Sequence, residues 1–301
     1  MAVTGASGFV GGALLRGLRE RGYVVVGLSR RGPDISWDIA GGPLSHAPTV
    51  DAVVHCAALV RDGPLKPAHV AVNVEGTSNV LSSFPRARIV HISSASVYDP
   101  WMPKDLVRED ALPPQRWLNG YGETKRAAED LVRRLRPDAA VLRPHAVYGS
   151  GDTTLLPRIL RARVAGRQLA MGDGCNRITL TAIANLVDAV AAALRRPQAY
   201  GPFNIGDPDT PTIADVLACL LDCLGLPRVI TWIPRTVAWG AAIVSERLAG
   251  PREPLLSRYA VNQMSLNFTL SLDRARQELK WEPKLTHQSA FADLAQGARH
   301  G

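Results

Sequence analysis

Tyr121 and Lys125 are the residues whose types and spacing most directly indicate chemistry. They lie four residues apart at a predicted helix start, so the phenol and the ammonium share one helix face. A free tyrosine has a pKa of about 10 and is a poor base at neutral pH. A nearby positive charge stabilises the phenolate and lowers that pKa. We therefore expect Tyr121, assisted by Lys125, to act as a general acid or base.

A serine-rich run supplies a third polar group. Ser94 lies in the run His91–Tyr98, which ends a predicted strand, and precedes Tyr121 by 27 residues. Its hydroxyl would hydrogen-bond a substrate carbonyl oxygen and stabilise the alkoxide that develops there. We assign Ser93 to capping the strand end, and Ser96 is a second candidate contact with the substrate. Ser94, Tyr121 and Lys125 thus form a candidate catalytic triad.

A glycine-rich turn near the start of the chain indicates an anionic ligand. Gly5, Gly8 and Gly11 follow a predicted strand and open a predicted helix. Gly5 permits a tight turn, Gly8 removes a side chain from the path of a phosphate, and Gly11 lets the helix pack closely. The helix N-terminus adds unpaired N–H groups and a positive dipole end. This context predicts dinucleotide binding, which would supply the hydride partner for the triad.

Strands and helices alternate through the first half of the chain, which predicts a Rossmann-type, doubly wound parallel sheet of the α/β class. The predicted strands are Ala2–Thr4, Tyr23–Leu28, Ala52–His55, Arg88–Ile92 and Ala139–Leu142. The predicted helices are Val10–Arg21, Val72–Ser82, Tyr121–Leu135 and Leu155–Ala165. Because Met1 leaves little room for a strand before Gly5, we expect the natural protein to start a few residues earlier.

The composition changes after Tyr148, where glycines and prolines become frequent and the elements shorter. We expect residues 1–150 to form the dinucleotide-binding domain and residues 151–301 a smaller α/β substrate lobe. A return of the chain to the main sheet is expected near residues 180–205, through the apolar segment Ile183–Leu194 and a strand at Phe203–Ile205. A further helix is predicted over Ile213–Leu224.

The spacing Gly5-x-x-Gly8-x-x-Gly11 resembles the extended branch of the short-chain dehydrogenase/reductase superfamily (the NAD-dependent epimerase/dehydratase superfamily). The runs His55-Cys56-Ala57-Ala58, Ser93-Ser94-Ala95-Ser96-Val97-Tyr98 and Leu142-Arg143-Pro144 resemble segments of the same family. The resemblance implies a triad of Ser94, Tyr121 and Lys125. The cofactor contacts it implies, besides the three glycines and the residues Tyr121 and Lys125, are Ser7, Phe9, Val10, Asp38, Ile39, Ala57, Ala58, Asn73, Pro144 and Val147.

The end of the second predicted strand bears on the choice of cofactor. An acidic residue there would favour NAD(H), but this sequence has Ser29-Arg30-Arg31. A hydroxyl and two guanidinium groups suit a 2′-phosphate, since arginine offers planar, charge-assisted donors. We therefore expect NADP(H) to be preferred, with NAD(H) possible. The alternative is that Arg30 stacks on the adenine while Arg31 lies in solvent, which is compatible with either cofactor.

Features of the second half indicate a hydrophobic substrate. Ala146 stands where sugar-nucleotide enzymes of the family usually carry an asparagine. Arg177, after a Gly-Asp-Gly run, lies one position earlier than the corresponding arginine of those enzymes. A diphosphate-binding site is therefore doubtful unless Arg177 or Arg143 provides it. His145 is interpreted as a packed imidazole rather than a pocket residue. The apolar segment Thr236–Leu248, interpreted as a buried or pocket-lining helix rather than a membrane-surface helix, fits a greasy ligand.

The resemblance is strongest to the 3β-hydroxysteroid dehydrogenase-like branch, covers nearly the whole chain, and rests on the runs Leu156-Pro157-Arg158, Gly172–Asn176, Phe203–Asp207 and Leu256–Tyr259. It implies interconversion of a secondary alcohol and a ketone. The substrate would be of the 3β-hydroxysteroid or β-keto/β-hydroxy acid type. Two alternatives remain open: a sugar-nucleotide 4-epimerase or dehydratase with tightly bound NAD, and a cofactor-sensing protein without turnover.

The composition argues against several other classes of protein. With 301 residues, 46% of them hydrophobic and 21% charged, the chain matches a globular enzyme rather than a disordered protein. The net charge of +8 is spread along predicted helices without interleaved aromatics, so we expect no nucleic-acid partner. No Cys/His cluster has the spacing of a metal site, so no metal is expected. We also expect no stable membrane insertion, a cytoplasmic location and, by family analogy, a possible homodimer.

Overall fold

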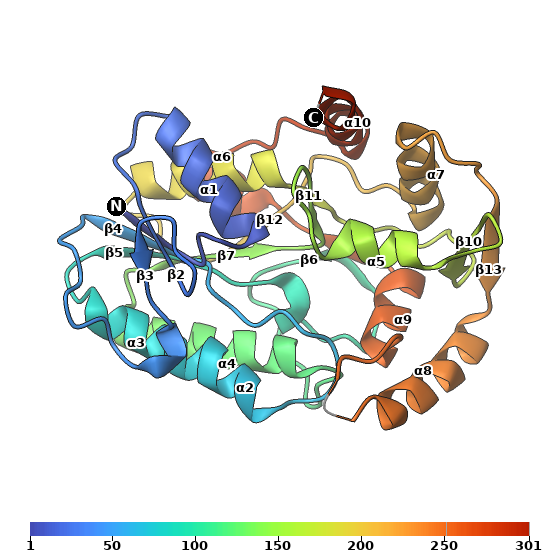
Figure 1. The fold of residues 1–301 in the computed structure, drawn as a ribbon, viewed down its shortest axis with the longest axis horizontal. Coiled ribbons are helices and arrows are strands. Elements are labelled where there is room, and N and C mark those ends of the chain that lie inside the picture. Colours follow the sequence, from blue (N-terminus) through green and yellow to red (C-terminus); the bar gives the residue numbers. More distant parts are fainter. Residues whose placement is uncertain (251, 301) are drawn as a thin grey trace.

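A seven-stranded parallel sheet forms the centre of the computed structural model, which describes residues 1–250 and 252–300 (Figure 1). The strand order is β12-β7-β5-β4-β1-β2-β3. The strands are β1 (Ala2–Thr4), β2 (Val26–Ser29), β3 (Ile35–Ser36), β4 (Ala52–His55), β5 (Arg88–Ile92), β7 (Ala140–Pro144) and β12 (Gly201–Ile205). Because the order reverses direction beside β1, the prediction of a doubly wound parallel sheet is confirmed.

Helices cover both faces of this sheet. Figure 1 shows α1 (Phe9–Glu20) and α6 (Ile183–Arg195) on one face, with α3 (Gly76–Ser83) and α4 (Gly120–Leu135) on the other. Strands buried on both sides must be apolar along their whole length. β4, with the sequence Ala-Val-Val-His, is buried at every position, and β5 is buried from Ile89 onward. Sheet and helices thus enclose two hydrophobic cores, one on each face.

Three predicted elements differ in extent. β2 begins at Val26 rather than Tyr23, because Val24 is 85% exposed and lies outside the sheet. The helix predicted over Val72–Ser82 is longer and interrupted: α2 (Pro67–Val70) and a π-helical turn, η2 (Ala71–Glu75), precede α3. Helix α5 (Leu155–Arg161) ends before the predicted Ala165, because the chain reverses there into a hairpin with Ala165 and Gly166 at positive φ.

The second half of the chain forms smaller sheets. β10 (Arg167–Met171) pairs with β9 (Arg163–Val164) and β13 (Ile230–Ile233), β8 (Val147–Tyr148) with β11 (Thr181–Ala182), and β6 (Lys104–Val107) with β14 (Phe268–Leu270). The helices are α7 (Ile213–Cys223), α8 (Arg235–Ala249), α9 (Arg258–Ser265) and α10 (His287–His300). β12 joins the main sheet beside β7, as the expected return of the chain requires. We keep the division near residue 150 as a proposal.

The interpretation of Thr236–Leu248 as a buried helix is wrong. This segment lies in α8, where only Ala238 and Ala242 are buried, and Val237, Val244 and Leu248 are exposed. The reason is that α8 packs against α9 through its small alanines and the half-buried Trp239, whereas Val237, Val244 and Leu248 point outward. Within the described residues, no helix combines the length and apolar content that crossing a bilayer needs.

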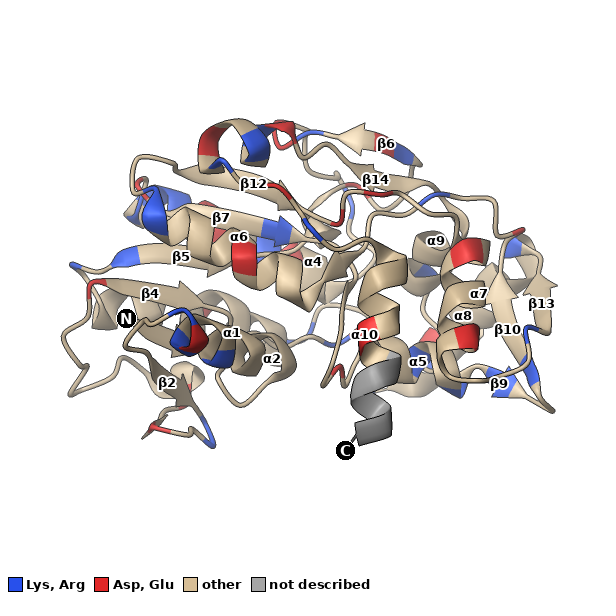
Figure 2. Ribbon diagram, turned by 90° about the horizontal axis from the view of Figure 1, so that it is seen from above, with Lys and Arg blue, Asp and Glu red and all other residues tan. Residues whose placement is uncertain are grey.

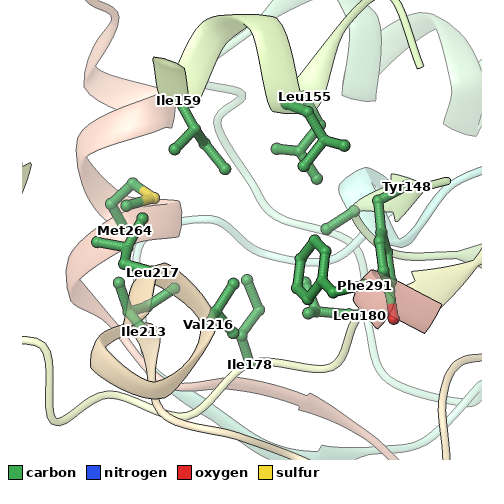
Figure 3. A pocket seen from close by; sticks show the side chains of 12 residues that line it. Tyr148, Leu155, Ile159, Ile178, Leu180, Ile213, Val216, Leu217, Met264 and Phe291 are labelled. Atoms are coloured by element: carbon green, nitrogen blue, oxygen red, sulfur yellow. The ribbon is translucent and has the colours of Figure 1, made fainter. Parts of the chain in front are cut away.

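A small apolar cavity lies in the core of the second half (Figure 3). It has a volume of about 40 Å³ and is enclosed by side chains of α5, α7, α9 and α10, among them Leu155, Leu217, Met264 and Phe291. Such a volume would hold at most about three water-sized spheres, and apolar walls keep it dry. Because none of the predicted catalytic residues lines it, this cavity is a packing gap and not the catalytic site.

Charged side chains are dispersed over the molecule. Figure 2 shows Lys and Arg interleaved with Asp and Glu along the helices rather than gathered in one stripe. Many arginines form local ion pairs, such as Arg126 and Arg133 with Asp130 on α4. Exposed pairs of this kind add little to stability. The net charge therefore does not mark a single basic groove in the described part of the chain.

Candidate active site

The glycine turn lies between β1 and α1. Gly5 has a φ of +72°, and a Cβ on it would lie 2.9 Å from the backbone of Ala57. A Cβ on Gly11 would lie 2.1 Å from the carbonyl oxygen of Gly5. Gly8 is exposed, and no side chain caps the N-terminus of α1. The turn therefore combines close backbone packing with free N–H donors on its outer side, which is what a pyrophosphate requires.

The end of β2 provides a second polar corner. Ser29 is buried to 8% exposure, and its Oγ has no hydrogen-bond partner among the described residues. Such an orphaned hydroxyl is costly unless a ligand satisfies it. Arg30 and Arg31 follow directly, are exposed, and form no ion pair within the described part of the chain. These three side chains offer hydrogen-bond donors and positive charge to a ligand at the end of β2.

Other predicted cofactor residues have identifiable structural partners. Asp38 Oδ1 accepts the N–H of Ala40 at 3.1 Å, and Ile39 is buried in the core beside α3. The amide of Asn73 is fully engaged: Oδ1 accepts the N–H of Leu59 at 2.7 Å, and Nδ2 donates to Thr124 Oγ1 at 2.9 Å. Asn73 therefore fixes the chain that follows Ala57 and Ala58. Direct contacts of these residues with a cofactor stay predictions.

The predicted catalytic residues meet where β5 ends and α4 begins. Asn119 caps α4 by accepting the N–H of Gly122 at 3.0 Å, which fixes the first turn that carries Tyr121. Lys125, one turn later, is buried and donates from Nζ to the carbonyl oxygen of Ile92 at 2.6 Å. Ser94 lies two residues beyond that carbonyl, and its hydroxyl is near enough to Tyr121 to favour the phenolate and so to lower the pKa of the phenol. The structure thus brings Ser94, Tyr121 and Lys125 together.

Burial works against both ionisable members of this group. It raises the pKa of Tyr121 to about 12, although the Ser94 hydroxyl opposes the rise. It lowers the pKa of Lys125 to about 8, with the nearby Glu129 and Cys56 opposing that change. The sequence predicts a lowered phenol pKa, and the protein alone does not produce it. The Lys125 ammonium has three donors and binds one carbonyl among the described residues, so two of its donors are left for other partners.

Two further hydroxyls extend the catalytic group. Ser94 Oγ donates to Ser96 Oγ at 2.9 Å, and Ser96 Oγ lies 2.7 Å from Tyr259 Oη. Tyr259 comes from α9 and is not among the residues that the sequence predicts for the site. The run Leu256–Tyr259 belongs to the family resemblance, but it gives Tyr259 no role, because the residue lies 163 positions from its partner. The assignment of Ser93 to a cap is wrong: its buried Oγ has no partner among the described residues.

Hydrogen bonds between two loops lie beside the catalytic group, and we call this set of contacts the clasp. Asp62, in the loop after β4, accepts hydrogen bonds from the hydroxyl of Ser257 and the N–H of Gly63, and its own N–H donates to Glu253. Burial raises the pKa of the Asp62 carboxyl, which these hydrogen bonds oppose. Glu253 also pairs with Arg158 at the start of the second half. The clasp therefore joins the loop after Ala58 to the segment that leads into α9.

The residues that the sequence offers for binding a diphosphate make contacts within the protein instead. Arg143 is 3% exposed and binds Glu129 through two hydrogen bonds of 3.0 and 2.6 Å. It is therefore not available to a substrate. His145 is held between Thr179 O and Gln263 Oε1, each at 2.8 Å, as expected for a packed imidazole. Arg177 lies on the surface and donates to Thr210 O at 2.9 Å.

Pro144 and Val147 flank a bend at the end of β7. Ala146, between them, has a φ of +46°, in the left-handed region that asparagine tolerates better than alanine. The bend carries the chain from the main sheet into β8, so it marks the passage to the second half of the molecule. The contacts of Pro144 and Val147 with a nicotinamide stay predictions.

Similarity to known proteins identifies this arrangement. The sequence profile of the NAD dependent epimerase/dehydratase family matches residues 1–206. The chain belongs to this family. It is an NAD(P)-dependent oxidoreductase of the extended short-chain dehydrogenase/reductase type.

Several members of the epimerase/dehydratase family resemble this one along nearly its whole length. A 4-hydroxy-2-methyl-3-oxo-4-farnesyl-3,4-dihydroquinoline-1-oxide ketoreductase from Stigmatella aurantiaca is 30% identical, covering 99% of this chain and 96% of that protein. A 2-alkyl-3-oxoalkanoate reductase from Stenotrophomonas maltophilia is 29% identical over 97% of both. A 3-beta-hydroxysteroid dehydrogenase from Mycolicibacterium neoaurum is 26% identical over 97% of this chain and 89% of that protein, in line with the predicted branch.

Solved structures of the family share the fold. MoeE5 in complex with UDP-glucose and NAD has a TM-score of 0.75 and 25% identity, covering 99% of this chain and 98% of MoeE5. The human epimerase family protein SDR39U1 (isoform 2), solved with NADPH, has a TM-score of 0.75 and 21% identity over 98% of both chains. Because the identity to SDR39U1 is only 21%, that similarity is evidence of a shared fold alone.

Proposed function

We propose that this family member is an NADP(H)-preferring ketoreductase that interconverts a secondary alcohol and a ketone on a hydrophobic substrate. The observation that carries the proposal is the meeting of Ser94, Tyr121 and Lys125 beside the glycine turn. The relatives that cover nearly the whole chain include a farnesyl-quinoline ketoreductase and a 2-alkyl-3-oxoalkanoate reductase. Both names describe reduction of a ketone that bears apolar chains, so a β-keto acid or a 3-ketosteroid is the substrate type we favour.

In the direction of reduction, Tyr121 Oη gives its proton to the substrate oxygen while Ser94 Oγ donates a hydrogen bond to that same oxygen. A bound nicotinamide supplies the hydride. Ser94 now donates to Ser96, so its O–H must turn toward the substrate when the carbonyl arrives. Lys125 provides the positive charge that favours the phenolate left behind, and the developing negative charge is stabilised by groups already in place.

The dinucleotide is assigned to the glycine turn and the end of β2. Gly5, Gly8 and Gly11, with Ser7, Phe9 and Val10, would hold the pyrophosphate, and Lys125 would hold a ribose. Ser29, Arg30 and Arg31 would hold the 2′-phosphate, since the hydroxyl is orphaned and both guanidinium groups are exposed and form no ion pair among the described residues.

A sugar-nucleotide 4-epimerase or dehydratase is the second candidate, since structural relatives such as MoeE5 were solved with UDP-glucose. Two observations favour the ketoreductase. Arg143 is held by Glu129 in the core, and alanine replaces the polar side chain at position 146. A ketoreductase consumes cofactor during turnover, whereas an epimerase returns it unchanged, so net oxidation of NADPH separates the two.

The test uses the purified protein with NADPH and panels of 2-alkyl-3-oxo acids and 3-ketosteroids. We expect consumption of NADPH with at least one panel, and Tyr121→Phe to lower kcat by more than about 100-fold while cofactor affinity changes little. The exposed Tyr200→Phe is the matched control and keeps full turnover. Turnover retained in Tyr121→Phe refutes the proton-donor role. A protein that binds NADPH but turns over no ketone favours the cofactor-sensing alternative.

A further inference from the structure

Helix α8 turns an apolar stripe toward solvent. Val237, Ala241, Val244 and Leu248 are spaced four, three and four residues apart, so they lie along one side of the helix. The exposed fractions are 61% for Val237, 55% for Val244 and 82% for Leu248. A surface helix ordinarily turns its polar side outward. Here the outward side is apolar, and we call these four residues the α8 surface.

The α8 surface lies at the outer edge of the molecule. Figure 1 shows α8, in orange, far from the central sheet and covered by no other element on its outer side. Beyond the end of the helix, Leu255 is also fully exposed. Contiguous exposed apolar side chains of this kind mark an interaction site more often than isolated ones do.

Basic residues border the α8 surface. Arg247 and Arg252 are exposed, and neither forms an ion pair within the described part of the chain. Arg235, at the start of α8, is turned toward α9, where it donates to Asn262 Oδ1 at 2.9 Å. The acidic side chains of this stretch are held in ion pairs, Glu246 with Arg258 and Glu253 with Arg158. An apolar stripe with a cationic border complements a partner whose outermost layer is anionic and whose next layer is apolar.

We propose that the α8 surface docks on an anionic lipid surface, with α8 lying in the plane of the interface. Apolar side chains would enter the acyl boundary while the arginines meet phosphate groups, as in other interfacial helices. The helix has 15 residues and is too short to cross a bilayer. A second copy of the chain suits this face less, because a two-fold dimer would bring two identical cationic borders to one interface while the acidic side chains of this stretch are already paired.

The position of α8 gives such docking a use. α8 packs against α9, and Tyr259 of α9 contacts Ser96 in the catalytic group. Docking would therefore bring the side of the proposed active site next to a reservoir of apolar molecules. This use rests on the proposed function, whereas the docking itself does not.

The experiment is vesicle co-sedimentation of the full chain. Vesicles of phosphatidylcholine, with and without phosphatidylglycerol, are compared at low and at physiological salt. We expect wild type to bind the vesicles that contain phosphatidylglycerol. The double variant Val244→Glu/Leu248→Glu should bind them at least about tenfold more weakly, since both side chains would lose apolar contact. Arg247→Gln/Arg252→Gln should bind several-fold more weakly and lose its dependence on salt.

The matched control is Val24→Glu/Leu112→Glu, two apolar residues that are each 85% exposed and lie outside α8. It should bind as wild type does. If the glutamates unfold the protein in a thermal melt, Val244→Ser/Leu248→Ser replaces them and should weaken binding in the same direction. Absence of wild-type binding, or equal binding by the α8 and control variants, overturns the proposal.

Sedimentation velocity tests the alternative that a second copy of the chain covers the α8 surface. A wild-type dimer that Val244→Glu/Leu248→Glu converts to a monomer, without any vesicle binding by wild type, shows that the α8 surface joins two copies and refutes lipid docking. None of these readouts requires turnover, so a failure of the docking proposal is distinct from a failure of the ketoreductase proposal.

Discussion

Lys125 carries a charge in a place where burial opposes it. Its side chain is 2% exposed, and burial lowers its pKa from 10.5 to about 8. Between these two pH values the unfolded chain binds more protons than the folded one, so the contribution of Lys125 to the free energy of unfolding rises with pH. Below pH 8 the folded protein bears the full cost of the buried ammonium, and by pH 10.5 the cost has gone.

Lys125→Met should therefore stabilise the protein at pH 7 by about 1–2 kcal/mol. The lowered pKa corresponds to about 3 kcal/mol, and the lost hydrogen bond to Ile92 O offsets part of it. The gain should shrink as the pH approaches 10, where the wild-type amine is largely neutral. Urea unfolding at both pH values measures this, and a variant less stable than wild type at pH 7 contradicts it. The same variant should have lost turnover.

Arg30 and Arg31 should decide between the two nicotinamide cofactors. Each guanidinium that binds a phosphate contributes about 1.5–3 kcal/mol, so Arg30→Ala or Arg31→Ala should weaken NADPH binding by about 10- to 100-fold. NADH affinity should stay nearly constant. Fluorescence titration measures both constants. Arg86→Ala, which changes an exposed arginine just before the start of β5, is the control. If wild type binds NADH at least as tightly as NADPH, this assignment of the two arginines is wrong.

At the scale of elements, Gly122 sets how closely α4 approaches the turn that carries Ser94. A Cβ at this position would lie 2.5 Å from the carbonyl oxygen of Ser96. Gly122→Ala must therefore push α4 from the Ser94–Val97 turn, which should destabilise the protein by about 1–3 kcal/mol and lower turnover by about tenfold or more.

Gly240→Ala in α8 is the matched control for Gly122→Ala. A Cβ there meets nothing within 4 Å, so the better helix propensity of alanine should stabilise the protein by up to about 1 kcal/mol. Chemical denaturation compares the two variants. Equal effects at both positions would show that helix propensity, and not the spacing of α4 from the turn, decides the outcome.

The sequence predicts the elements of the first half well because burial there leaves a strong pattern. β4 and β5 read as apolar runs, and polar residues begin where these strands end. The carboxyl ends of parallel strands lie at one edge of the sheet. The amino-acid pattern alone therefore suffices to place the glycine turn, Ser94 and Tyr121 close together.

The parts that the sequence does not reveal depend on contacts between distant segments. Tyr259 meets Ser96 and Ser257 meets Asp62 across more than half of the chain, from loops and short helices without periodic pattern. The predicted burial of Thr236–Leu248 is wrong because apolar composition does not reveal which side of a helix finds a partner. The engagement of Arg143 by Glu129 is likewise invisible in the sequence, since both belong to a buried cluster between β7 and α4.

At the scale of the whole molecule, the halves of the chain are joined at several places, among them the pairing of β14 with β6, and two of these joints flank the site. One is the pairing of β12 with β7, and the other is the clasp of Asp62 with Ser257 and Glu253 at the opposite side of the site. The catalytic group lies beside the clasp and takes Tyr259 from the second half. A homodimer and a cytoplasmic location stay predictions at this scale.

The place of β12 in the sheet has a consequence for synthesis on the ribosome. Until Gly201–Ile205 has emerged, β7 presents an open row of N–H and C=O groups along the margin of a nascent domain whose other strands are already translated. Such an open margin invites pairing with neighbouring nascent chains. Pausing of translation before Gly201–Ile205 has left the exit tunnel should thus be more harmful to the yield of native protein than pausing after that segment has emerged.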